Sequence, residues 1–216
     1  MLLTEPDPMS DAASPGVTPL RPTTESRTVR SRAANDAARG RLHLTRDEVH
    51  RLMRGAIRHN RHGRRDALML RLAFEHGLRV SELVGLRWSA IDLTTHELRV
   101  TRAKGSLDGT HPLQGDTVRA LKRYQRDSGR TAGLVFVNER GAPVSADGFR
   151  RLLHRLSERV LGVKWHPHAL RHACGVHLIN QGVDLRTVQQ YLGHANVQNT
   201  VAYTALTGRP FERLSF

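Results

Sequence analysis

From residue 42 onward, apolar residues recur at helical spacing through most of the chain. In "LTRDEVHRLMRGAI", Thr45 and Glu48 stand at capping-box spacing, and apolar residues follow at intervals of three and four. Later segments repeat this periodicity and are bounded by a capping residue such as Asp184 or a closing glycine such as Gly77. After this first helix, further helices are therefore expected over residues 64–77, 80–86, 115–129, 145–160, 167–182 and 184–193.

The pattern changes between residues 90 and 113, in "AIDLTTHELRVTRAKGSLDGTHPL". Apolar and polar residues alternate there, β-branched residues are frequent, and turn residues interrupt the run, which predicts a small antiparallel sheet. The apolar run "GLVFVN" at residues 133–138 is also strand-like. The expected fold class is mainly α with one small antiparallel β-sheet around a single core, and the sequence shows no internal repeat.

Residues 1–40 have a different character from the rest of the chain. They carry five of the nine prolines, little apolar periodicity and, near their end, a run of arginines. We expect a disordered, basic N-terminal tail at 1–40, a folded domain at 41–208 and a short C-terminal tail at 209–216. No secretory signal pattern or membrane-length apolar run is visible, so a cytoplasmic protein is the default expectation.

The charge balance adds a partner class to this picture. The formal net charge is +14, with 34 Lys and Arg against 20 Asp and Glu, and such an excess is typical of proteins that bind a polyanion, most often nucleic acid. The one cysteine, Cys174, allows no internal disulfide and lies among apolar residues, which indicates a packed thiol.

The segment "HPHALRHACG" holds several candidate functional side chains. His168 and Arg171 are three residues apart and share a helical face, and His172 follows one turn after His168. Three interpretations compete. The first is a zinc site at His166, His168 and His172, against which stand an adjacent arginine and the lack of a Cys or acidic partner at ligand spacing. In the second, the histidines only form local hydrogen bonds. In the third, Arg171 binds phosphate oxygens with both arms of its guanidinium while His168 transfers a proton.

Two further basic residues stand at turns. Arg79 lies between Gly77 and a predicted helix, where the first amides of the helix favour an anion and Glu82 is placed to form a salt bridge with it. An ordinary surface arginine beside a capping glutamate is the alternative. Lys104 precedes Gly105 in a predicted hairpin turn, from which it can donate a proton or simply be solvated.

Near the end of the chain, "GHANVQNTVAYT" places Tyr203 nine residues after His194. On one continuous helix these two side chains would lie on opposite faces. Gly193 and Asn196 instead suggest a break followed by a short helix, which lets His194 and Tyr203 converge on one site.

Taken in order, "GLRVSEL", a lysine in a β-turn, "HALRH" and "LGHANVQNTVAYT" resemble the tyrosine recombinase (phage integrase) family over residues 42–208. The phrases "THPL", "HPHALRHACG" and "YLGHANVQNTVAYTA" are most similar to those of the small fimbrial phase-variation invertases. The resemblance implies the tyrosine recombinase catalytic-domain fold. Most members also carry an N-terminal helical domain of about 100 residues, for which the first 40 residues here leave little room, so we expect a weaker grip on DNA or a need for accessory proteins.

The resemblance implies site-specific recombination of DNA, by inversion or by integration and excision. Arg79, Arg171 and His194 would bind the nonbridging oxygens of a phosphodiester and stabilise charge in the transition state. A free tyrosine, with a pKa of roughly 10, is a weak nucleophile at neutral pH. His168 would therefore take the proton of Tyr203 as it forms a 3′-phosphotyrosyl bond, and Lys104 would protonate the departing 5′ oxygen. The expected catalytic set is Arg79, Lys104, His168, Arg171, His194 and Tyr203, and it uses no cofactor, metal or ATP.

The implied partners are double-stranded DNA, a homo-tetramer of this chain on DNA that separates to a monomer or dimer when free, and accessory DNA-bending proteins. Association with the nucleoid in the cytoplasm follows from this, and no membrane is involved. Two alternatives stay open: a DNA-binding regulator that retains the fold without recombining, and a type IB topoisomerase that uses the same chemistry to relax DNA.

Overall fold

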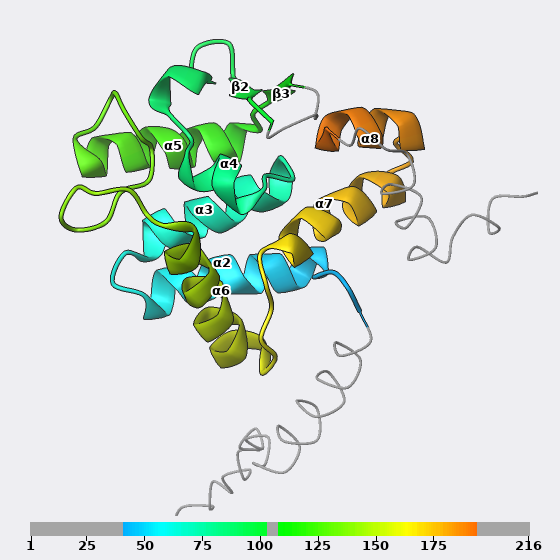
Figure 1. Ribbon diagram of the computed structural model, residues 1–216, viewed down its shortest axis with the longest axis horizontal. Coiled ribbons are helices and arrows are strands. Elements are labelled where there is room, and N and C mark those ends of the chain that lie inside the picture. The colour runs from blue at the N-terminus through cyan, green and yellow to red at the C-terminus, as the bar shows by residue number, and fades with distance from the viewer. Residues whose placement is uncertain (1–40, 103–107, 194–216) are drawn as a thin grey trace, which may run out of the picture.

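A computed structural model describes residues 41–102 and 108–193 of the chain (Figure 1). The expected N-terminal tail, Lys104, His194, Tyr203 and the expected C-terminal tail lie outside these residues. Within them, every predicted helix is present. The helices are α2 (Arg46–His59), α3 (Gly63–Glu75), α4 (Val80–Val84), α5 (Gly115–Ser128), α6 (Ala146–Leu161), α7 (His168–Asn180) and α8 (Leu185–Leu192), with a 3-10 turn at Trp88–Ala90.

The helix boundaries follow the capping chemistry of the sequence. Thr45 and Glu48 form the predicted capping box: the Thr45 hydroxyl accepts a hydrogen bond from the Glu48 N–H at 3.2 Å, and the Glu48 carboxylate accepts one from the Thr45 N–H at 2.8 Å. The Ser145 side chain accepts from the Gly148 N–H at the start of α6, and the Asp184 side chain accepts from the Arg186 and Thr187 N–H groups at the start of α8. These side chains satisfy amides that the first turn of a helix leaves without partners, so they set where each helix begins.

The predicted antiparallel sheet is confirmed. It has the order β1-β2-β3, with β1 at Ile91–Asp92, β2 at Glu97–Val100 and β3 at Gly109–Pro112. Leu98 and Val100 of β2 face the core while their neighbours face solvent. The strand expectation for "GLVFVN" was wrong, because residues 134 and 137 form only isolated bridges to Arg87 and Pro143. Proline offers no N–H for a continuing ladder, and the apolar side chains of this run enter the core from an irregular segment.

Helix α3 lies at the centre of the fold and contacts α2, α4, α5 and α7. Its residues 66–70 and 72–74 are all buried, as expected for a helix covered on most sides. In Figure 1, β2 and β3 lie near α8, and α2 and α6 lie on the opposite side of α3. A smaller apolar cluster joins α7 to α8 through Cys174, Val176, Val188 and Leu192. Among the described helices, none combines the length and apolar character that a membrane span needs.

Candidate active site

The turn between α3 and α4 is where the candidate residues come together. Gly77 has a φ of +56°, a conformation in which other residues are strained. A Cβ atom at this position would lie 2.4 Å from Leu192 Cδ2, so α8 approaches the turn closely. The carbonyl oxygen of Gly77 accepts hydrogen bonds from two buried arginines, Arg171 and Arg102.

Arg79 follows this turn and is the N-cap residue of α4. Its guanidinium forms the expected salt bridge with Glu82 at 2.8 Å, and its backbone N–H donates to the other oxygen of the same carboxylate, also at 2.8 Å. The Glu82 side chain is 4% exposed, whereas that of Arg79 is 33% exposed. Burial tends to raise the pKa of Glu82, but the Arg79 N–H and the charge of Arg102 outweigh it and hold that pKa below its usual range. Glu82 is therefore a charged, buried anchor for a partly exposed guanidinium.

Arg171 lies on the buried face of α7 and is 1% exposed. Its Nη1 donates to the Gly77 carbonyl and its Nη2 donates to the Leu192 carbonyl, each at 2.5 Å. These two bonds connect α7 to the Gly77 turn and to the end of α8. Leu192 stands two residues before His194 in the sequence, so the anchoring of Arg171 is close along the chain to another candidate residue.

His168 is the first residue of α7 and is exposed to solvent. Partial desolvation lowers its pKa below 6.5, and the positive charges of Arg171, His166 and Arg79 lower that pKa further. His168 is therefore mainly neutral at pH 7 and able to accept a proton. Because both arginines act on its pKa, His168, Arg171 and Arg79 share one electrostatic neighbourhood.

The zinc interpretation receives no support from the histidine cluster. The rings of His168 and His172 meet edge to face at 4.3 Å between centroids. Burial, together with the charges of His168 and His166, lowers the pKa of His172 to about 4. Within residues 41–102 and 108–193, no three His, Cys, Asp or Glu side chains form a group able to hold a metal ion. Cys174 is a packed thiol as expected, and burial raises its pKa to about 12.

Sequence reasoning missed Arg102, which lies beneath the site. Its side chain is 1% exposed and donates to the Glu82 carboxylate at 2.8 Å and to the carbonyls of Tyr191, His76 and Gly77 at 2.6, 3.2 and 3.3 Å. The signal that predicts its burial is alternation, because Arg102 continues the inward series of Leu98 and Val100.

Two of the three tyrosines of the chain lie within the described residues. Tyr124 is buried, and burial raises its pKa. The Tyr191 hydroxyl donates to the Glu75 carbonyl at 2.9 Å, its ring stacks on His111 at 3.8 Å between centroids, and burial raises its pKa as well. Neither hydroxyl is therefore available as an activated nucleophile.

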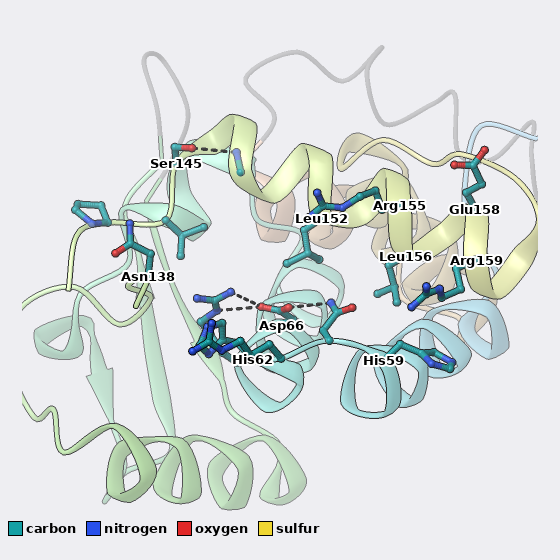
Figure 2. A pocket seen from close by; sticks show the side chains of 16 residues that line it. His59, His62, Asp66, Asn138, Ser145, Leu152, Arg155, Leu156, Glu158 and Arg159 are labelled. Carbon is teal, nitrogen blue, oxygen red and sulfur yellow. Dashed lines mark hydrogen bonds and ion pairs between the residues drawn. The ribbon is translucent and has the colours of Figure 1, made fainter. Parts of the chain in front are cut away.

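The cavity in Figure 2 lies elsewhere. Its volume is about 910 Å³, and it is formed by the α2–α3 turn, residues 138–145 and one face of α6. Asp66 on its floor accepts hydrogen bonds from Arg65 and Asn60, which appear as dashed lines in Figure 2. Arg79, His168 and Arg171 are not among its lining residues. The candidate site therefore lies outside this cavity.

Comparison with known proteins places this geometry in a family. The model described as "Phage integrase family" matches residues 43–209. The type 1 fimbriae regulatory protein FimE of Escherichia coli K12 is 34% identical over 180 residues, which cover 81% of this chain and 90% of FimE. The tyrosine recombinase XerD of Ralstonia nicotianae is 39% identical over 149 residues, which cover 66% of this chain and 48% of XerD.

Solved structures agree in fold. The XerA recombinase superposes with a TM-score of 0.69 at 29% identity, covering 81% of this chain and 66% of XerA. The Tn1549 transposon integrase in complex with transposon right end DNA gives a TM-score of 0.63 at 21% identity, covering 80% of this chain and 65% of the integrase. The expected tyrosine recombinase fold is thus confirmed, and this chain belongs to the phage integrase family of tyrosine recombinases.

Proposed function

We propose that this recombinase cuts and rejoins double-stranded DNA at specific sites through a covalent 3′-phosphotyrosyl bond at Tyr203. The observation that carries the proposal is that Arg171 bonds to the Gly77 turn, Arg79 follows this turn, and both guanidiniums add to the desolvation that lowers the pKa of His168. Two guanidiniums and a neutral imidazole are the groups that phosphoryl transfer without a metal needs.

The arginines act on the negative charge of the phosphate. A phosphodiester resists nucleophilic attack because it is anionic, and further charge collects on its nonbridging oxygens in the transition state. Arg79 is held by Glu82 with its side chain partly exposed, which suits direct contact with a phosphate oxygen. Arg171 supplies positive charge from beneath, and His194 adds a donor in the proposed complex.

In the covalent step one bond forms, one bond breaks and two protons are transferred. The Tyr203 oxygen bonds to phosphorus while the bond from phosphorus to the 5′ oxygen breaks. The tyrosine proton passes to His168, and Lys104 gives a proton to the departing 5′ oxygen, which leaves as a hydroxyl. Attack by the 5′ hydroxyl of another strand reverses these transfers and restores the diester, so no ATP is consumed.

Tyr203 is assigned as nucleophile from its position in the family motif and from the state of the other tyrosines. Tyr124 and Tyr191 are buried with raised pKa values, and the Tyr191 hydroxyl is committed to the Glu75 carbonyl. Tyr203 is the remaining tyrosine of the chain.

Covalent capture tests the assignment. The protein is expressed in its host, the cells are lysed in strong denaturant without crosslinker, and DNA still attached to the protein is sequenced. We expect DNA enriched at discrete inverted repeats with the wild type and with Tyr124→Phe, and none with Tyr203→Phe. Attachment that survives Tyr203→Phe would refute the role of Tyr203. Specific DNA binding without covalent attachment of the protein, even on a nicked substrate that traps the intermediate, would favour the alternative of a DNA-binding regulator that does not recombine DNA.

The assembly and the organisation of the chain belong to the same proposal. A homo-tetramer on DNA brings four cleavage sites together, and DNA-bending proteins serve as accessory partners on the nucleoid. In this proposal the chain consists of an N-terminal tail at 1–40, a catalytic domain at 41–208 and a C-terminal tail at 209–216. DNA that is relaxed without strand exchange would indicate the topoisomerase variant instead.

A further inference from the structure

We infer that Arg102 is a positioning residue for DNA cleavage, which fixes Arg79 and Arg171 relative to each other so that both act on one phosphate. The inference rests on the proposed function and concerns a residue outside the expected catalytic set. Arg102 is the last described residue after β2, and its guanidinium is buried beneath the Gly77 turn.

One contact of Arg102 leads to Arg79. The Glu82 carboxylate is shared: one oxygen accepts from the Arg79 guanidinium, and the other accepts from Arg102 and from the Arg79 N–H, all three at 2.8 Å. Glu82 therefore stands between the buried guanidinium of Arg102 and the partly exposed guanidinium of Arg79. With Arg102 in place the carboxylate has a fixed orientation, and the orientation of Arg79 follows from it.

A second contact leads to Arg171. Arg102 Nη1 donates to the Gly77 carbonyl at 3.3 Å, and Arg171 Nη1 donates to the same oxygen at 2.5 Å. The Arg102 Nη2 also donates to the Tyr191 carbonyl at 2.6 Å, one residue before the Leu192 carbonyl that receives Arg171. Both carbonyls that hold Arg171 thus belong to segments that Arg102 also holds.

The arrangement needs the geometry of arginine. Arg102 serves four acceptors from three separate parts of the chain: the α3–α4 turn, α4 and α8. A planar guanidinium carries five donors in a rigid fork, whereas a lysine ammonium has three donors on one atom. Lysine at position 102 keeps the charge opposite Glu82 but cannot reach all four oxygens, so we expect it to retain the fold and lose the alignment.

The test uses Arg102→Lys in the full chain, with Arg99→Lys as matched control, because Arg99 lies three residues earlier on β2 and is exposed. The substrate is a nicked duplex built on the captured site, from which a short fragment leaves after cleavage and traps the covalent complex. Single-turnover cleavage is measured at saturating protein. The scissile position carries either the normal phosphate or a neutral methylphosphonate, and thermal melting confirms that each variant is folded.

On the normal phosphate, Arg102→Lys should cleave about 10²-fold more slowly than the wild type, the scale of loss that follows a displacement of about 1 Å. On the methylphosphonate the difference should largely disappear, because a neutral centre no longer needs two aligned guanidiniums. Arg99→Lys should match the wild type on both substrates. DNA binding by Arg102→Lys should be unchanged, since Arg102 is buried.

An equal loss on both substrates would overturn the inference, because a general loss of folded protein does not depend on phosphate charge. Wild-type rates on the normal phosphate would overturn it as well. A wild-type protein that cleaves neither substrate would overturn the proposed function, and this inference with it. Should Arg102→Lys fail to melt cooperatively, Glu82→Gln replaces it, since that change weakens the same connection from the other side and should show the same dependence on phosphate charge.

Discussion

His168 begins α7, and its surroundings favour the unprotonated form of its imidazole. Its pKa is lowered first by partial desolvation and then by Arg171, His166 and Arg79. A base must be unprotonated before it can accept the proton of a tyrosine, and a lowered pKa keeps His168 in that form at neutral pH. The same cations that would bind the phosphate therefore also prepare the base.

A pH dependence of cleavage follows at the residue scale. Because desolvation and the nearby positive charges lower the pKa of His168 below 6.5, the neutral form predominates at pH 7 and is lost as the pH falls through that lowered value. Cleavage measured at subsaturating protein, which reports the free enzyme, should be flat near neutrality and should decline in acid with a midpoint below 6.5. His168→Gln should slow cleavage about 10²-fold or more and remove this decline. An unchanged acid limb in the variant would assign the base to another group.

At the scale of elements, the Gly77 turn is the point where α3, α4, α7 and α8 meet. Its carbonyl holds two arginines, its φ is positive, and Leu192 of α8 fills the space beside it. The position of α8 and the anchoring of Arg171 therefore depend on the absence of a side chain at residue 77.

Gly77→Ala should destabilise the fold by more than the roughly 1–2 kcal/mol that a left-handed conformation costs a residue with a side chain, and it should also impair cleavage. Gly129→Ala is the matched control, since Gly129 has a φ of +65° and nothing within 4 Å of the position of a Cβ. Urea denaturation and covalent trapping measure the two effects. If both variants lose equal stability and both still cleave, the contact between the turn and α8 has no role in the site.

The elements were largely predictable because their signals are local. Thr45 and Asp184 cap the helices as their positions predicted, and alternation located the sheet. The contacts of the site were less predictable, because they join residues far apart in the sequence. The Arg79–Glu82 salt bridge spans three residues and was expected, whereas Arg102 reaches back 20 residues to Glu82 and forward 89 to Tyr191. No local pattern predicts such acceptors, and Arg102 was not singled out, although its place in the alternation after Leu98 and Val100 agrees with its burial.

At the scale of the whole molecule, a neutral buried cluster supports the site from below. His76 and His111 are 1% and 2% exposed, their rings lie 5.6 Å apart, and His111 stacks on Tyr191. Burial, with the positive charge of Arg102 nearby, lowers the pKa of His76 to about 3 and that of His111 to about 4. In the described part of the chain, His76 Nε2 has no hydrogen-bond partner, so protonation there would place an uncompensated charge in the core.

Acid should therefore destabilise the molecule well before its carboxylates titrate. Below pH 6.5 the unfolded chain binds protons at both histidines while the folded chain does not, so the free energy of unfolding falls as the pH falls through this window. Between pH 7 and pH 5 each histidine should lower the free energy of unfolding by an amount on the order of 1–2 kcal/mol.

His111→Phe keeps an aromatic ring against Tyr191 and removes one titrating group, so the stability of this variant should fall less over the same pH range. His154→Phe on the exposed face of α6 is the control. Urea unfolding at both pH values gives the comparison, and equal losses in wild type and His111→Phe would mean that His111 is not part of the acid response.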